Sequence, residues 1–311
     1  MPAEAGGAGD AGPRGLASAP VADVVALVGQ AWDAACTLAA GLDLDRPSRR
    51  PGRSVRDVLV PLGSWPEHER FSALLDGGPA DGAGQDGTAG DGPLDDDTLA
   101  AVHAGAGTAA VTAALRRARD GALALLSGPD GGQGGRRPVA SPVGPLPLTC
   151  AIAASCYDLA VHALDVADAD DVPGPLLTAG IAALVDVTGA LAARSGTAAR
   201  FAVRTPQGGW ACVTRGPGAW TTSPLDGGRA GLPLLEGAAA DVLDASAGRR
   251  SPVPLLAARR LRLHDVPGLM ALLPVLEAVP GLPGGAALRT TARVLGGTGR
   301  LVGRLGPALR R

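Results

Sequence analysis

Apolar residues return every three or four positions through the first two thirds of the chain. This spacing is typical of amphipathic helices, and stretches rich in glycine and proline mark the loops between them. The pattern predicts helices over residues 21–42, from residue 54 onward, over 95–126, over 148–169 and from 173 to about 196. Four or five long helices joined by polar loops favour an antiparallel four-helix bundle.

The pattern changes after residue 197, where stretches with a period of two replace the helical spacing. Residues 200–205 form the first of them, and Gly208 and Gly209 separate it from the next. A period of two on both sides of a glycine turn predicts a β-hairpin. The other expected elements are strands over 210–214, 220–222 and 261–263 and a helix over 234–247. The predicted fold class is α+β, with a helical bundle followed by a small α+β domain.

The two ends of the chain differ in composition from these domains. Residues 1–20 are rich in glycine, alanine and proline, which predicts a disordered start that is neither a signal peptide nor a membrane span. In the last segment, arginines recur at spacings of 4, 7, 4 and 7, at Arg289, Arg293, Arg300, Arg304 and Arg311. On a helix they form one basic stripe, which is typical of a membrane-surface or partner-binding helix. A solvated, frayed tail is the other interpretation.

These patterns divide the chain into four parts. They are a disordered N-terminus (1–20), a helical bundle (21–197), a small α+β domain (198–265) and a helical basic tail (266–311). A total length of 311 residues is enough for two domains.

Composition excludes several classes of function. The net charge of −2 gives no strong attraction for nucleic acid, and no run of 18 strongly apolar residues predicts a transmembrane segment. Four irregularly spaced cysteines do not make a disulfide framework, so we expect buried, reduced thiols in a cytoplasmic protein. The chain also lacks a phosphate-binding loop and a serine-hydrolase elbow. The oligomeric state is left open.

The helix that begins near residue 54 carries clear boundary signals. Ser54 is a good N-cap, and Asp57 at the third helical position suits the positive end of the helix dipole. Pro61 falls inside the same apolar pattern. Because proline removes a backbone hydrogen bond, it is expected to kink or end this helix.

Chemistry-bearing residues gather in the predicted helix over 148–169. Asp158 and His162 are four residues apart and share one helical face, and Asp165 lies three residues beyond His162. A carboxylate and an imidazole one turn apart can supply two of the three or four ligands of a Zn²⁺-type ion. A charge-paired Asp and His on a half-buried helix is the simpler interpretation of the same spacing.

Three local patterns resemble one family. They are residues 54–63 (SVRDVLVPLG), residues 158–165 (DLAVHALD) and residues 235–243 (LEGAAADVL), the last followed by Gly248 and Arg249. Together they resemble the mycothiol-dependent maleylpyruvate isomerase-like family. The resemblance covers about residues 20–265 and implies a DinB-like metal-binding four-helix bundle followed by a sterol-carrier-like α+β domain. The basic tail lies outside it.

The resemblance also implies a ligand set. The family's metal is held by one histidine from the first pattern and by a Glu and a His from the second. Asp158 and His162 stand at the two positions of the second pattern, whereas Pro61, which has no donor atom, stands at the position of the first histidine. His68 and His103 are candidate replacements. Asp165 is expected to be a helix-face partner or to hold a ligand rather than to bind metal itself.

Two functions follow from the resemblance. The first is a mycothiol-dependent isomerase or thiol transferase that uses a divalent metal, Zn or similar, on a small electrophilic or acidic substrate. The alternative is a non-catalytic, metal-free descendant that binds an apolar ligand or a protein partner. In that case Trp210 and Trp220 either line an apolar groove or fill the core, and the basic tail provides contact with a membrane surface. A regulatory protein that uses the bundle as an interaction platform is a more remote possibility.

Overall fold

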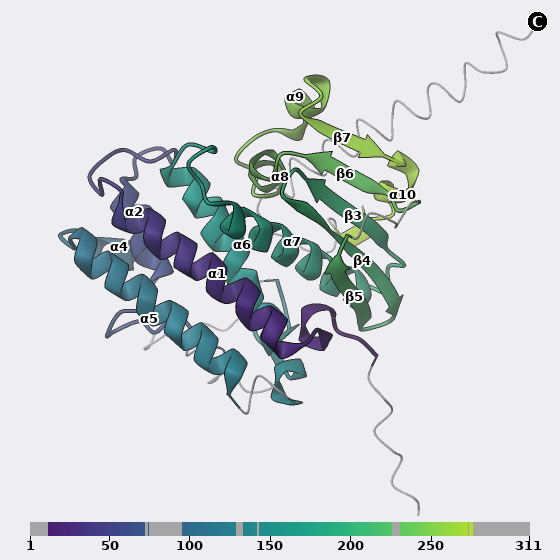
Figure 1. The fold of residues 1–311 in the computed structure, drawn as a ribbon, viewed down its shortest axis with the longest axis horizontal. Coiled ribbons are helices and arrows are strands. Elements are labelled where there is room, and N and C mark those ends of the chain that lie inside the picture. Colours follow the sequence, from purple (N-terminus) through teal and green to yellow (C-terminus); the bar gives the residue numbers. More distant parts are fainter. Residues whose placement is uncertain are drawn as a thin grey trace, which may run out of the picture.

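A computed structural model describes residues 12–71, 74, 95–128, 133–141, 143–225, 231–272 and 274–275. The basic arginine stripe and residues 1–11 lie outside these ranges. Four long helices and a five-stranded sheet form the structure, and α7 lies between the other helices and the sheet (Figure 1). Helices and sheet share one continuous apolar core. The predicted α+β class is confirmed at this level.

The bundle is built from α1 (Val21–Ala40), α5 (Thr108–Ser127), α6 (Leu148–Val166) and α7 (Gly174–Arg194). α1 packs against α5, α6 and α7, and α6 packs along α7. Short elements connect these helices: α2 (Val55–Leu59), η2 (Val60–Leu62), α4 (Asp96–Val102), η3 (Gln133–Arg136) and the β1–β2 pair (Pro138–Val139 and Leu146–Pro147).

The boundary signals of α2 are borne out by its geometry. The Ser54 hydroxyl accepts from the Asp57 amide at 3.2 Å, and the Asp57 carboxylate accepts from the Ser54 amide at 2.8 Å, which completes a capping box. The helix ends after Leu59, and Pro61 lies in the 3₁₀ turn η2. Proline has therefore ended the α-helix, as its missing amide requires.

The sheet contains β3 (Arg200–Thr205), β4 (Gly208–Gly216), β5 (Ala219–Pro224), β6 (Leu234–Gly237) and β7 (Leu261–His264). Its strand order is β5-β4-β3-β6-β7; β3 and β6 are parallel and the other pairs are antiparallel. α7 covers β4 and β5, and α8 (Ala239–Ser246) packs on α6 and α7. α9 (Pro252–Ala257) and α10 (Val266–Met270) flank β7.

Two expected helices were wrong in part. The stretch 95–126 is divided between α4 and α5, and Gly107 is the N-cap of α5. Gly105 and Gly107 lower the helix propensity enough for the chain to break there. Residues 234–237 form β6 rather than the first turn of a helix, because Leu234 and Leu235 pair with β3 on one side and β7 on the other. Tertiary pairing has overridden local propensity here.

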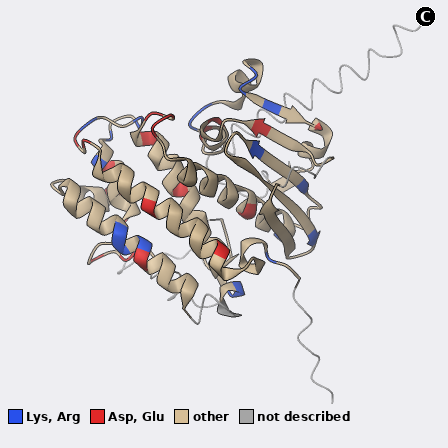
Figure 2. Cartoon of the chain, viewed as in Figure 1, with Lys and Arg blue, Asp and Glu red and all other residues tan. Residues whose placement is uncertain are grey.

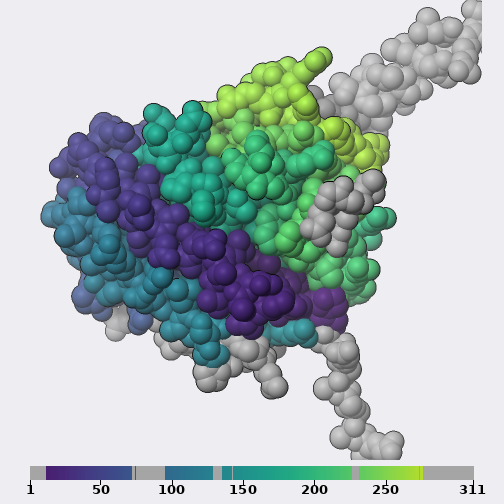
Figure 3. All heavy atoms as spheres, in the orientation of Figure 1, coloured from purple at the N-terminus to yellow at the C-terminus, as the bar shows by residue number. Residues whose placement is uncertain are grey.

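The prediction of a disordered start fails for residues 12–20. This segment forms the 3₁₀ turn η1 (Gly15–Ser18), and Leu16 is buried. The Trp220 amide donates to the Pro13 carbonyl at 2.8 Å, so the segment pairs with the outer edge of β5. Figure 3 shows the N-terminal part, in purple, running from the bundle onto the green sheet. The cause is a buried carboxylate, Asp186, that accepts the Leu16 amide at 3.0 Å.

Two helices, α1 and α7, are long and apolar enough to cross a membrane, with mean hydropathies of 1.3 and 1.8. Length and composition alone do not separate such helices from the core helices of soluble proteins. α7 is largely buried between the bundle and the sheet, and α1 buries one face against the other bundle helices.

Candidate functional site

Of the residues singled out on α6, Asp165 contacts the segment that follows α8. Asp165 is 1% exposed, and its carboxylate receives two hydrogen bonds from Arg249, at 3.0 Å from Nε and 2.8 Å from Nη2. His162 Nδ1 lies 3.2 Å from the same carboxylate. Burial alone would raise the pKa of Asp165, but the hydrogen bonds from His162 and Arg249 outweigh it and hold that pKa below its usual range. Asp165 is therefore an ionised partner of Arg249 and His162.

Arg249 belongs to a larger ionic network between the bundle and α8. Asp244, which is buried, accepts from Arg49 at 2.8 Å and lies 3.2 Å from Arg250. Asp241, also buried, is bound by Arg260 through two hydrogen bonds of 2.8 and 2.6 Å. Buried carboxylates with bidentate arginine partners fix the geometry of the groups that carry them. The pairs Arg49–Asp244 and Arg249–Asp165 therefore join α8 and the turn after it to the helical part of the chain.

Asp158 has a cationic partner that the sequence did not reveal. The Arg70 guanidinium donates to Asp158 Oδ2 at 3.2 Å from Nη2 and to the Pro61 carbonyl at 2.9 Å from Nη1. The Arg70 amide also donates to the Ser64 hydroxyl at 3.2 Å, which fixes the backbone of this residue. A guanidinium therefore joins Asp158 to the backbone at Pro61.

The two candidate replacement histidines differ in their surroundings. The backbone of His68 pairs with that of Trp65, while its ring Nδ1 is buried and makes no hydrogen bond with any of the described residues. Burial and the nearby Arg70 cation lower the pKa of His68. His103 Nε2 pairs with the Glu67 carboxylate, and its ring stacks on Trp65 with centroids 3.7 Å apart. In the part of the chain that the structure describes, no three His, Cys, Asp or Glu side chains gather as a metal-ligand group. Neither histidine therefore completes a site with Asp158 and His162.

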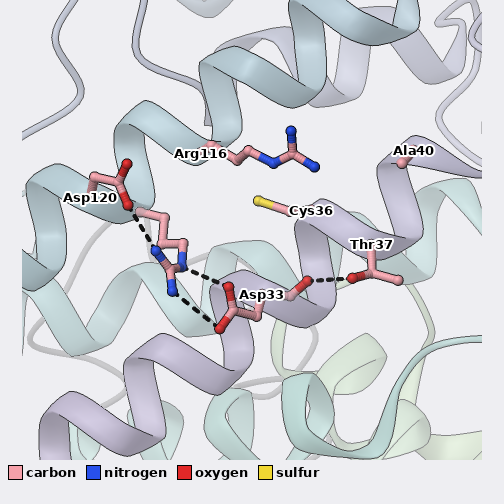
Figure 4. A pocket seen from close by; sticks show the side chains of 7 residues that line it. Asp33, Cys36, Thr37, Ala40, Arg116 and Asp120 are labelled. Carbon is pink, nitrogen blue, oxygen red and sulfur yellow. Dashed lines mark hydrogen bonds and ion pairs between the residues drawn. The ribbon is translucent and has the colours of Figure 1, made fainter.

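A groove on the bundle surface, about 590 Å³ in volume, lies between α1 and α5 (Figure 4). Its wall includes Cys36 beside Arg116, while Arg119 pairs with both Asp33 and Asp120. Burial raises the pKa of the Cys36 thiol to about 11, so the thiol is protonated at neutral pH and is a poor nucleophile. The groove therefore offers no activated thiol.

The other three cysteines are also unsuited to thiol chemistry. Cys156 and Cys212 are buried, and burial raises the pKa of each to about 12. Burial and the charge of Asp186 raise the pKa of Cys150 well above its usual range. The expected burial of the four cysteines is confirmed.

An apolar pocket of about 230 Å³ lies between the sheet and helices α7 and α8. Leu184 and Thr188 on α7 and Val242 on α8 form one side of it. The inward side chains of β3, β6 and β7 form the other, and residues from α9 and α10 and from 272 and 275 complete the wall. The lining is almost wholly aliphatic, which suits an apolar molecule.

Comparison with known proteins assigns the helical part of the chain. Residues 25–167 match the Mycothiol maleylpyruvate isomerase N-terminal domain. This part of the chain belongs to that domain family. Two solved structures resemble the chain, a mycothiol-dependent maleylpyruvate isomerase and a histidine-to-alanine mutant of it. They are 13% and 14% identical, with TM-scores of 0.44 and 0.41, and each alignment covers 76% of this chain and 92% or 93% of that one. No curated protein matches the chain.

The residues of this mycothiol maleylpyruvate isomerase N-terminal domain do not fit a catalytic divalent metal. Pro61 offers no side-chain donor, and its carbonyl accepts from Arg70. Asp158 is paired with the same arginine, and His162 is paired with Asp165. A divalent ion held by the protein needs three or more donors, and an arginine beside the carboxylate competes with it for charge. Two donors, Asp158 and His162, remain from the predicted set, and their role as ligands stays a prediction.

Sequence reasoning missed the partners of the candidate site residues. Arg70 and Arg249 meet their carboxylate partners across 88 and 84 residues, and no local spacing signals such pairs. Trp220 is buried, and its indole Nε1 donates to Asp186 at 2.9 Å. Trp220 therefore fills the core, and neither it nor Trp210 lines the apolar pocket.

Proposed function

We propose that this chain is a metal-independent member of its domain family that binds a small apolar molecule. The binding site is the aliphatic pocket between the sheet and helices α7 and α8, and this pocket is the observation that carries the proposal. Its volume of about 230 Å³ exceeds the roughly 150 Å³ of an engineered protein cavity that takes up benzene. Burying an apolar surface gains about 25 cal/mol per Å², so an aliphatic lining is enough to hold such a ligand.

The competing proposal is a mycothiol-dependent isomerase or thiol transferase, and its only support is the match to the domain family. Such chemistry requires a metal that activates a thiol or water. The Arg70 guanidinium already pairs with Asp158 and disfavours a cation there. The pKa values of the four buried cysteine thiols are raised, which disfavours thiol chemistry. The balance of the site residues favours binding over catalysis.

Filling the pocket is expected to weaken uptake of an apolar probe. Thr188 lines the pocket, and its hydroxyl donates to the Leu184 carbonyl at 2.7 Å. The larger ring in Thr188→Phe should occupy the space of the ligand and weaken binding of N-phenyl-1-naphthylamine about tenfold or more, since losing a buried apolar group costs about 1.5–3 kcal/mol. Fluorescence titration of the full chain measures the affinity.

Thr37→Phe is the matched control for this experiment. Thr37 also lies on a helix, with its hydroxyl donating to the Asp33 carbonyl at 2.8 Å, but it lines the groove in Figure 4 instead of the apolar pocket. Binding should be unchanged in this variant. If the wild-type chain does not bind the probe, or if both phenylalanine variants bind like the wild type, the proposed pocket function is wrong.

Metal analysis separates the two proposals. Protein purified without chelator is expected to hold far less than one equivalent of Zn, Ni, Mn or Fe, because only two of the family's donors are present and Arg70 neutralises one of them. Mass spectrometry of the metals, repeated on His162→Ala, gives the answer. One equivalent of a metal in the wild type that disappears in His162→Ala would restore the metalloenzyme proposal.

A further inference from the structure

The exposed edge of the sheet at β7 joins an apolar surface to a basic one. A groove of about 440 Å³ follows this edge and is lined by Leu256, Leu261 and Leu263 together with Arg259 and Arg262. The same three leucines line the apolar pocket. The groove therefore lies directly beside the pocket, with two guanidinium groups at its rim.

The side chains of these two arginines have no ion pair among the described residues, although Glu236 lies opposite Arg262 in the β6–β7 register. Around them, Arg204 is paired with Glu236, which His264 also contacts, and Arg260 is paired with Asp241. Arg259 and Arg262 are exposed, and their guanidinium groups make no hydrogen bond or ion pair with any of the described residues. Figure 2 shows basic segments, in blue, on β7 and in the turn before it. The rim of the groove therefore presents a net positive charge.

The backbone of Arg259 adopts a conformation that is unusual for a residue with a side chain. Arg259 adopts a left-handed conformation with φ of 57° at the end of α9. Its amide donates to the Leu256 carbonyl at 3.0 Å, and the Arg260 amide donates to the Leu255 carbonyl at 2.9 Å, which is a Schellman turn. Glycine is the favoured residue at this position because a Cβ is strained there. An arginine kept in such a strained position points to a use for its side chain.

We propose that the ligand of the apolar pocket is an amphiphile whose anionic head is bound by Arg259 and Arg262. This inference rests on the proposed pocket function and adds the chemical class of the ligand. An aliphatic chain would lie against the leucines, and a carboxylate or phosphate head would accept hydrogen bonds from the two guanidinium groups. The unpaired positive charge at the rim selects this occupant over a neutral one.

The test compares two ligands with the same chain and different heads. Dodecanoate is expected to bind the full-length protein about fivefold more tightly than dodecanol, because each of the two exposed arginines contributes a modest attraction for the anionic head. Calorimetric titration measures both affinities, and dodecyl phosphate, titrated in parallel, shows which anionic head is preferred. High salt should reduce the preference for the anion, since the arginines are exposed.

Arg259→Gly with Arg262→Gln removes both charges and keeps the fold, because glycine suits the left-handed turn. This double variant should bind dodecanol as the wild type does and lose the preference for dodecanoate. Arg200→Gln, an exposed arginine at the far end of β3, is the matched control and should keep the preference.

The outcomes tell the two proposals apart. Equal affinity of the wild type for dodecanoate and dodecanol, or an unchanged preference in the double variant, overturns the head-group inference and leaves the apolar pocket standing. Failure to bind either ligand or the neutral probe, as expected if another part of the chain fills the pocket, overturns the pocket function itself.

Discussion

Replacing Arg249 by alanine is expected to lower the free energy of unfolding by about 3 kcal/mol or more. The change leaves the Asp165 carboxylate, which is 1% exposed, without its bidentate partner. Breaking a buried ion pair from one side costs about 3–5 kcal/mol, and the remaining contact with His162 places this case toward the lower end. Urea unfolding followed by tryptophan fluorescence measures the effect.

Arg53→Ala is the matched control, because Arg53 pairs with Asp97, whose side chain is 76% exposed. An exposed pair contributes about 0–1 kcal/mol, so this variant should be close to the wild type. In a double-mutant cycle, Asp165→Asn should recover part of the stability lost in Arg249→Ala, since the amide carries no buried charge. Equal losses in Arg53→Ala and Arg249→Ala would show that the Arg249–Asp165 pair contributes no more than a surface pair.

The Arg249–Asp165 pair also predicts how the stability of the protein changes at acid pH. The pKa of Asp165 is lowered in the folded state, so its contribution is present above the ordinary aspartate pKa of about 3.9. That contribution is lost as the pH falls through the lower, folded-state value. The Arg249→Ala chain lacks the stabilised carboxylate and should therefore unfold at a higher pH than the wild type during acid titration.

Local signals in the sequence were enough to predict the helices and much of the sheet. The capping residues Ser54 and Asp57 and the helix-ending Pro61 act through hydrogen bonds within a few residues, so spacing alone identifies them. The period-two stretch at 200–205 and the glycine turn after it are equally local, and they pair as β3 and β4. Such features depend little on the rest of the chain.

The structural features that the sequence did not predict depend on contacts between distant segments. The sequence of residues 234–237 is compatible with a helix. These residues form a strand because they pair with β3 on one side and with β7 on the other. Residues 12–20 look disordered by composition, yet Asp186 and Trp220 hold them from 170 or more residues away. The α6 motif predicted a polar face correctly, but its partners Arg70 and Arg249 come from other elements. Spacing on one helix carries no information about those partners.

Asp186→Ala is expected to destabilise the protein by about 3 kcal/mol or more and to release residues 12–18. Asp186 is fully buried, and its Oδ1 atom accepts from the Leu16 amide at 3.0 Å, Trp220 Nε1 at 2.9 Å and the Thr222 hydroxyl at 2.6 Å. Each buried donor left without a partner costs about 1–3 kcal/mol. Urea unfolding gives the energy, and the rate of trypsin cleavage after Arg14 reports release of the segment.

Asp186→Asn separates the hydrogen bonds from the charge, because the amide oxygen can still accept from Leu16, Trp220 and Thr222. Burial raises the pKa of Asp186 above its usual range, against the opposing hydrogen bonds. Because the carboxyl pKa is higher in the folded than in the unfolded chain, proton binding stabilises the fold, and this stabilisation is complete below the ordinary pKa of about 3.9. It is lost as the pH rises through the folded-state pKa. The wild type should therefore lose stability relative to Asp186→Asn over that rise. A stability difference between the two chains that does not change with pH in this range would show that Asp186 stays ionised in the core.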